Sequence, residues 1–202
     1  MKKTILITGA TDGIGLKTAE ALVSQGHTVL VHGRSPVKLE KVENMLSALP
    51  GGGQVEAYVA DLSRMADVTA LAEAVRKNHS ALDGLINNAG VYKTPDPVTP
   101  DGLDTRFAVN TIAPYLLTQQ LLPLLDRTGR IVNLSSAAQA PFDPSDLAGP
   151  ARIPAGTAYA RSKLALTMWS RSMAGSFGES GPAVIAVNPG SMLGSKMVKE
   201  AY

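Results

Sequence analysis

The chain alternates short apolar runs with longer amphipathic stretches, and this order restricts the folds that it can adopt. The short runs are rich in Val and Ile, which is typical of buried strands, whereas the longer stretches repeat apolar residues at helical spacing. Strands that alternate with such helices predict β-α-β units and a parallel sheet with helices on both faces. With 202 residues, 45% of them hydrophobic, the chain suits a single α/β domain over residues 1–202.

The same pattern gives the bounds of the expected elements. The predicted strands are Ile5–Thr8, Thr28–His32, Val55–Val59, Gly84–Asn87, Arg130–Leu134 and Ala183–Val187. The predicted helices are Ile14–Ser24, Pro36–Leu49, Met65–Asn78, Leu103–Leu125 and Thr157–Phe177. Pro114 and Pro123 fall inside the fourth helix, so we expect a kink or a break there. Residues 137–156 contain four prolines and predict a long loop, which at this length is often functional.

Composition argues against several classes of partner. The net charge is +2 without a Lys/Arg block, and 4% of residues are aromatic, so we expect no nucleic-acid partner. No apolar run approaches the ~18 residues of a membrane span, so we expect no membrane partner. The three histidines lack ligand spacing, and we expect no metal. The absence of cysteine fits a reducing compartment, so the expected location is the cytoplasm.

A glycine-rich turn follows the first predicted strand and opens the first predicted helix. Glycines permit a tight turn and close backbone approach, while the helix N-terminus offers amides and partial positive charge to a phosphate. The candidate phosphate-binding residues are Gly9, Thr11, Asp12, Gly13, Ile14 and Gly15. A plain turn is the alternative. A P-loop would need adjacent Gly and Lys, and here Leu16 separates Gly15 from Lys17.

Arg34 follows the second predicted strand, where an NAD-preferring site usually offers an acidic residue to the ribose. A guanidinium there suits the 2′-phosphate of NADP, so we expect NADP(H) to be favoured over NAD(H), although an exposed arginine at a helix entrance would need no ligand. Asp61 and Leu62 follow the third strand. The Asp61 carboxylate can accept a hydrogen bond from an adenine amine, or it can cap the next helix.

Tyr159 and Lys163 are four residues apart within a predicted helix, which puts a phenol and an ammonium on one face. For acid/base work near neutral pH, a tyrosine pKa must fall by ~2–3 units from its usual value near 10. We expect the lysine charge, with an oxidised nicotinamide, to lower it. The alternative is a solvated helix pair that contributes a few tenths of a kcal/mol.

These segments together resemble the short-chain dehydrogenase/reductase family, over Thr4 to about Gly190. The resemblance rests on an ordered set of motifs: the Thr8–Gly15 turn, Asp61, Asn87-Asn88-Ala89-Gly90, Asn110, Ser135-Ser136, Tyr159-x-x-x-Lys163 and Asn188-Pro189-Gly190. It implies a doubly wound, Rossmann-like fold. It also implies that Asn88, Ala89 and Gly90 flank the cofactor, and that Pro189 and Gly190 lie near the nicotinamide.

The resemblance further implies a catalytic set of Asn110, Ser136, Tyr159 and Lys163. Tyr159 would move the proton and Ser136 would hold the substrate oxygen, with Ser135 as the alternative serine. Lys163 would also reach the nicotinamide ribose, and Asn110 would position Lys163 through water. Members of the family often form dimers or tetramers through two long helices, so a homo-dimer or homo-tetramer is expected.

Two features depart from the common family pattern. Ser136 and Tyr159 are separated by the long stretch 137–156, which loosely resembles the retinol dehydrogenase and protochlorophyllide reductase branch and suggests a substrate-side loop. Family members also continue through a seventh strand, whereas this sequence stops at Tyr202, so we expect that it lacks the usual C-terminal strand.

The expected function is an NADP(H)-dependent oxidoreductase that interconverts a small-molecule carbonyl and an alcohol by hydride transfer. A non-catalytic dinucleotide sensor or scaffold of the same fold is the alternative, but such a protein should have degraded catalytic positions, and all four are present. A nucleotide-sugar epimerase shares Tyr-x-x-x-Lys but usually has a differently spaced glycine turn. The substrate and the direction of reaction stay open.

Overall fold

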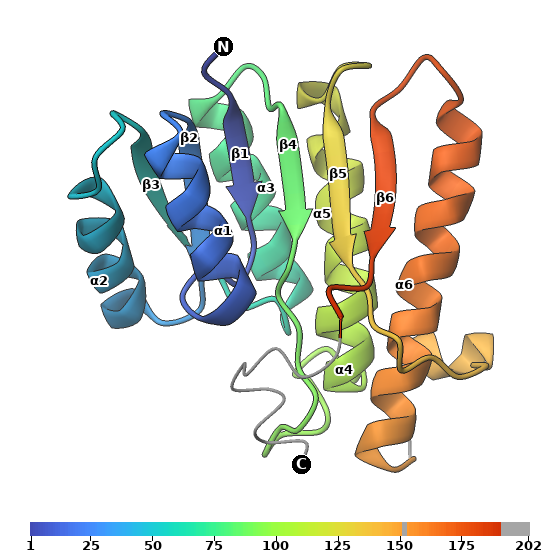
Figure 1. The fold of residues 1–202 in the computed structure, drawn as a ribbon. Coiled ribbons are helices and arrows are strands. Elements are labelled where there is room, and N and C mark those ends of the chain that lie inside the picture. The colour runs from blue at the N-terminus through green and yellow to red at the C-terminus, as the bar shows by residue number, and fades with distance from the viewer. Residues whose placement is uncertain (151–152, 191–202) are drawn as a thin grey trace.

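Six parallel strands form one sheet in the order β3-β2-β1-β4-β5-β6 (Figure 1). The computed structural model describes residues 1–150 and 153–190. The strands are β1 (Thr4–Ile7), β2 (Thr28–Gly33), β3 (Gln54–Val59), β4 (Gly84–Asn87), β5 (Arg130–Leu134) and β6 (Ala183–Val187). The parallel sheet confirms the expected doubly wound α/β fold, and each predicted strand is present within one residue at either end.

Helices cover both faces of this sheet. The main helices are α1 (Gly13–Ser24), α2 (Pro36–Ser47), α3 (Met65–Asn78), α5 (Ala113–Leu121) and α6 (Ala155–Phe177). In Figure 1, α1 and α2 lie in front of the sheet, and α3, α5 and α6 lie behind it. None of the helices in the described part of the chain has the length and apolar character needed to cross a bilayer.

The alternation of side chains along β1 decides how the core is divided. Ile5 and Ile7 pack into a cluster with apolar residues of α1 and α2. Leu6, which points to the opposite face, packs with residues of α3 and α5. Successive residues of a strand face opposite sides, so the apolar run of β1 is buried on both faces. This is why the first strand has no polar positions between its ends.

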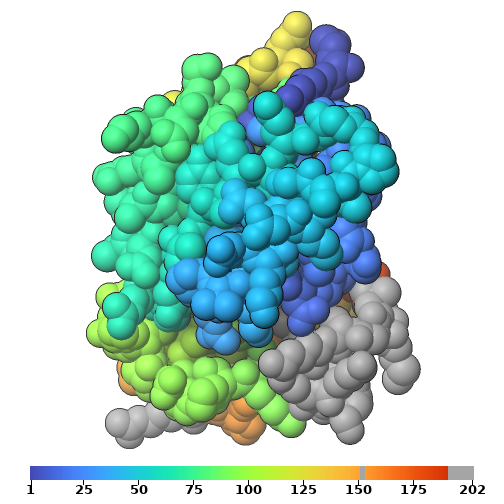
Figure 2. All heavy atoms as spheres, turned by 90° about the vertical axis from the view of Figure 1, so that its left-hand side faces the viewer, coloured from blue at the N-terminus to red at the C-terminus, as the bar shows by residue number. Residues whose placement is uncertain are grey.

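The carboxyl ends of all six strands lie along one edge of the sheet, at the bottom of Figure 1. The strand order changes direction between β1 and β4, where crevices for ligands form in open α/β sheets. The segments after β1, β4, β5 and β6 therefore meet at one edge. Figure 2 views the molecule from the β3 side, with α2 near the centre and the light green segment after β4 below it.

The predicted helix Leu103–Leu125 is interrupted, as the prolines suggested, but not only at the prolines. It consists of α4 (Thr105–Phe107), a π-helical segment η1 (Ala108–Ile112), α5 and a short 3₁₀ turn η2 (Leu122–Leu124). Pro114 lies in the first turn of α5, where a missing N–H costs little, and Pro123 lies in η2. In η1 the Ala113 amide donates to the Ala108 carbonyl, five residues back. The sequence pattern did not predict this widened turn.

The long loop between β5 and α6 is partly ordered. It contains a 3₁₀ turn, η3 (Pro144–Leu147), and α6 begins at Ala155, two residues earlier than predicted. Residues 151 and 152 lie outside the described residues. Contacts that hold the described part of the loop against the body include Phe142 with Phe107, Asp146 with Arg161, and Gly149 with Asp104.

Candidate active site

The glycine-rich turn after β1 has a backbone that only glycine adopts readily. Gly9 has φ 65° and Gly13 has φ 55°. Asp12 caps α1, and its side chain accepts a hydrogen bond from the Gly13 amide at 2.7 Å. A Cβ on Gly15 would lie 2.4 Å from both the Asn88 amide nitrogen and the Gly9 carbonyl oxygen. The turn is therefore built for close packing of α1 against the end of β4.

Asn88 and Thr8 join the ends of β1 and β4. The Asn88 side chain donates to the carbonyls of Thr8 and Gly9, both at 2.9 Å. The Thr8 hydroxyl accepts from the amides of Asn88 and Ala89, both at 3.1 Å. Ala89 also lies directly against Gly9, where an added Cβ would approach its Cα to 2.8 Å. Asn88 and Ala89 thus adjoin the glycine turn, followed by Gly90.

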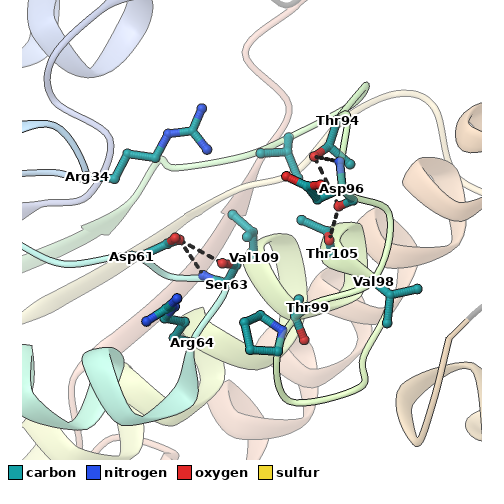
Figure 3. A pocket seen from close by; sticks show the side chains of 12 residues that line it. Arg34, Asp61, Ser63, Arg64, Thr94, Asp96, Val98, Thr99, Thr105 and Val109 are labelled. Atoms are coloured by element: carbon teal, nitrogen blue, oxygen red, sulfur yellow. Dashed lines mark hydrogen bonds between the residues drawn. The ribbon is translucent and has the colours of Figure 1, made fainter.

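Arg34 and Asp61 line one pocket of about 440 Å³ (Figure 3). Asp61 is held by Ser63, whose amide and hydroxyl both donate to Asp61 Oδ1, at 3.0 and 2.8 Å. It does not cap α3, because the cap position is occupied by Arg64. Leu62 turns away into the core and is 5% exposed. Of the two uses of Asp61 weighed from the sequence, capping is therefore wrong.

Sequence reasoning missed several residues of this pocket. Arg64 and Ser63 line it beside Asp61, and Val91 and Val109 reach it from other segments. Figure 3 shows the Arg34 and Arg64 side chains on either side of Asp61. Within residues 1–150 and 153–190, neither arginine takes part in a salt bridge. The only signal in the sequence was that Ser63 and Arg64 directly follow Asp61 and Leu62.

Tyr159 lies in the first turns of α6, close to Ser136 at the end of β5. Burial raises the pKa of Tyr159 above 10.0, the neighbouring Ser136 hydroxyl opposes this rise, and the neighbouring Tyr92 phenol adds to it. In the protein chain by itself the pKa is thus raised, and the lowering expected from the lysine together with an oxidised nicotinamide stays a prediction. Tyr92, which the sequence did not single out, packs edge-on against Tyr159 with ring centroids 5.1 Å apart.

Lys163 shares a face of α6 with Tyr159, as its spacing predicted. Its ammonium lies 5.8 Å from the centre of the Tyr159 ring and donates to the Leu134 carbonyl at 2.6 Å. The residue is 4% exposed, and burial lowers the pKa of Lys163 to about 8. The cation is thus anchored to the last residue of β5, just before the two serines.

The two serines after β5 face different surroundings. The Ser135 side chain is buried and shares a 2.7 Å hydrogen bond with the Thr167 hydroxyl. The Ser136 hydroxyl accepts from the Ala138 amide at 3.1 Å, and it lies close enough to Tyr159 to lower the pKa of that phenol. Of the two, Ser136 is the one beside the phenol.

Asn110 lies in the π-helical segment η1 and is 1% exposed. Its side chain accepts from the Val91 amide at 2.8 Å and donates to the Val91 carbonyl at 3.0 Å and to the Ser162 hydroxyl at 3.0 Å. It therefore fastens the segment after β4 to α6. The structure gives it no direct bond to Lys163.

Pro189 and Gly190 follow β6 at the same edge of the sheet. Gly190 has φ 97°, and its amide donates to the Asn188 side chain at 3.2 Å. This left-handed backbone explains why a glycine follows the proline. The predicted residues thus come from the segments after all six strands and from η1 and α6.

Comparison with known proteins gives consistent matches. The family described as short chain dehydrogenase matches residues 3–202. Retinol dehydrogenase 12 from Bos taurus is 36% identical over 204 residues, which cover 99% of this chain and 64% of that protein. The chain therefore spans less than two thirds of this curated relative.

Two solved structures that contain NADP are also similar to this chain. A metagenomic short-chain oxidoreductase in complex with NADP has a TM-score of 0.72 and 32% identity, covering 94% of this chain and 82% of that one. The Pseudomonas aeruginosa RhlG/NADP active-site complex has a TM-score of 0.76 and 30% identity, covering 98% and 75%.

Proposed function

Because this chain belongs to the short-chain dehydrogenase family, we propose that it is an NADP(H)-dependent oxidoreductase that interconverts a carbonyl and an alcohol. The single observation that carries the proposal is the buried ammonium of Lys163, which lies 5.8 Å from the centre of the Tyr159 ring and is held by the Leu134 carbonyl, just before Ser135 and Ser136. A phenol and a hydroxyl that converge on one point can hold a substrate oxygen between them.

The chain's own residues fit a nicotinamide dinucleotide. The first amides of α1 have no acceptor within the helix and lie behind a glycine turn, which suits a pyrophosphate. The pocket lined by Arg34 and Asp61 suits an adenosine that carries a 2′-phosphate. The similar structures named above contain NADP, which supports the same cofactor here. The guanidinium of Arg34 is our reason for favouring NADP(H) over NAD(H).

In the proposed mechanism, the residues at the ends of β5 and α6 handle the proton and the substrate oxygen. The bound nicotinamide supplies or takes up the hydride. Ser136 donates a hydrogen bond to the substrate oxygen and holds it where negative charge develops. Tyr159 donates its phenolic proton to that oxygen during reduction and takes it back during oxidation.

Lys163 contributes a fixed cation one helical turn from the phenol. Its anchoring to the Leu134 carbonyl keeps the charge beside the end of β5 rather than in solvent. Because burial raises the pKa of Tyr159, the phenol is a poor proton donor until positive charge offsets that burial. Lys163, together with a bound cofactor, would supply this charge. Asn110 acts as a positioning residue that holds Val91 against α6.

The remaining expectations stay predictions within this proposal. Residues 137–156 form a substrate-side loop, which is supported by their place between Ser136 and Tyr159. A homo-dimer or homo-tetramer is supported by Tyr115 and Met168, large apolar side chains that are 45% and 54% exposed on α5 and α6. A cytoplasmic location is supported by the absence of cysteine. The identity of the carbonyl substrate is left to experiment.

The test is Tyr159→Phe, which removes only the phenolic oxygen. We expect NADPH affinity within about twofold of wild type and a turnover loss of about 100-fold or more, because proton transfer contributes about 10²–10⁴-fold. Turnover is followed at the NADPH absorbance band with a panel of aldehydes and ketones, and affinity by quenching of protein fluorescence. Tyr115→Phe is the matched control and should keep full turnover. Full activity of Tyr159→Phe would remove the acid/base assignment.

A further inference from the structure

His32 is a buried histidine for which the proposed mechanism has no role. It lies one residue before the end of β2 and is 3% exposed. Both of its ring nitrogens are hydrogen-bonded. Nδ1 accepts from the Gly9 amide at 3.2 Å, and Nε2 is 3.1 Å from the Ala60 carbonyl oxygen.

These two partners determine which ring nitrogen carries the proton. The Gly9 amide can only donate, so Nδ1 must be the bare nitrogen. The Ala60 carbonyl can only accept, so Nε2 must carry hydrogen and donate it. The ring is therefore neutral, with one defined tautomer. A second proton on Nδ1 would face the Gly9 N–H and break that bond.

The imidazole connects two segments of the proposed cofactor site, the glycine turn for the pyrophosphate and the Asp61 segment of the adenosine pocket. Gly9 begins the glycine-rich turn, and the next amide, that of Ala10, donates to the His32 backbone carbonyl at 2.9 Å. Ala60 directly precedes Asp61, which lines the pocket with Arg34. His32 thus binds the successive amides of Gly9 and Ala10 in the turn, and it also binds Ala60, which precedes Asp61.

We propose that His32 is a positioning residue of the dinucleotide site, which sets the glycine turn through Nδ1 and the Asp61 segment through Nε2. The inference rests on the proposed function for the identity of the ligand. It assigns separate tasks to the two nitrogens. A histidine that merely filled the core would affect stability without affecting the two parts of the site separately.

Two substitutions can separate the two bonds. The amide group of Asn reaches the position of Nδ1, so His32→Asn can keep the bond from Gly9 and loses the bond to Ala60. The longer Gln reaches the position of Nε2, so His32→Gln can keep the bond to Ala60 and loses the bond from Gly9. His27→Asn is a matched control, because the Nδ1 of His27 also accepts a backbone amide, that of Lys3 at 3.3 Å, before β2 begins.

Two ligands distinguish the adenosine pocket from the glycine turn. Adenosine 2′-monophosphate has no pyrophosphate and therefore reports on the pocket of Arg34 and Asp61. NADPH also engages the turn. We expect His32→Gln to weaken the binding of NADPH by about threefold to tenfold, as the loss of one hydrogen bond implies. Its affinity for adenosine 2′-monophosphate should stay within about twofold of the wild-type value. We expect His32→Asn to weaken adenosine 2′-monophosphate by about threefold to tenfold. His27→Asn should change neither affinity.

Calorimetric titration of each variant with both ligands gives the affinities, and thermal melting gives the stability. If both His32 variants weaken the two ligands equally, in step with their loss of stability, the assignment to His32 is overturned while the proposed function stands. If the wild-type protein binds neither ligand, the proposed function itself fails.

A measurement on the wild-type protein keeps the inference testable should the variants not fold. The ¹⁵N shifts of the His32 ring should show the Nε2–H tautomer, and titration with NADPH should move the Gly9 amide resonance. An Nδ1–H tautomer, or a Gly9 amide that is indifferent to NADPH while other turn amides shift, would overturn the role assigned to Nδ1.

Discussion

Gly15 is the position where a single methyl group should do the most damage to the glycine turn. A Cβ there would lie 2.4 Å from the Asn88 side-chain nitrogen and 2.4 Å from the Gly9 carbonyl oxygen. The Gly9 carbonyl oxygen belongs to the backbone and can move little, so the Asn88 side chain must change its position to make room for the Cβ. Its bonds to the carbonyls of Thr8 and Gly9 would then be lost.

The magnitude of the effect of Gly15→Ala follows from these contacts. Two hydrogen bonds contribute about 1 kcal/mol each, and overpacking costs about 1–3 kcal/mol. Alanine is better than glycine in a helix by roughly 1 kcal/mol, which offsets part of the loss. The expected decrease in the free energy of unfolding is about 2–4 kcal/mol, or roughly 4–16 °C in melting temperature for a domain of this size. NADPH affinity should fall as well, because the displaced groups adjoin the turn.

Gly175→Ala is the matched control for this change. Gly175 is an exposed residue of α6, and among the described residues no atom lies within 4 Å of an added Cβ. This substitution should raise the free energy of unfolding by about 0.5–1 kcal/mol and leave NADPH affinity unchanged. Thermal melting and urea unfolding of both variants, with fluorescence titration by NADPH, provide the comparison. If Gly15→Ala is as stable as Gly175→Ala, the packing argument is wrong.

Two further predictions concern Arg34 and His32. Arg34→Ala should weaken the binding of NADPH about ten- to 100-fold and that of NADH hardly at all, because one charge-assisted hydrogen bond to the 2′-phosphate is lost. Equal losses of affinity for the two cofactors in fluorescence titrations would remove the specificity argument. Burial lowers the pKa of His32 from 6.5 to about 4, an effect that the hydrogen bond with the Ala60 backbone and the charge of Asp61 partly oppose. Between pH ~4 and ~6.5 the His32 imidazole is protonated in the unfolded chain but neutral in the folded protein. The free energy of unfolding should therefore be highest above pH ~6.5 and should fall by about 3 kcal/mol as the pH decreases to ~4. Urea unfolding at pH 7.5 and 5 should show this slope in the wild type and a flatter one in His32→Gln; identical slopes would contradict it.

Most of the fold could be predicted because it depends on local pattern. The apolar runs and their spacing set the strands, and the glycine turn identified the start of α1 within one residue. The predicted helix Leu103–Leu125 was wrong where the backbone hydrogen bonds depart from those of a regular α-helix. The π-helical segment at Ala108–Ile112 left no mark in the apolar periodicity, since residues 108–111 remain buried.

The candidate site could be predicted as a set of residues but not as a set of contacts. The motifs identified Tyr159, Lys163 and Ser136, and the structure brings them together. In the protein chain by itself the pKa of Tyr159 is raised, because it is set first by burial, a property of the surrounding packing. The partners of Asn110 were also missed, since Val91 and Ser162 are far from it in sequence.

The sequence by itself determined a parallel α/β sheet, its glycine turn and the order of its polar motifs, because periodicity and turn chemistry act between near neighbours in the chain. The tertiary structure alone decided which residues share a pocket and which charges are buried. His32 illustrates the difference. In the sequence it is one polar residue at the end of an apolar strand, and only the folded chain gives it the Gly9 amide on one side and the Ala60 carbonyl on the other. Such bonds depend on the packing of three strands, and no local pattern encodes them.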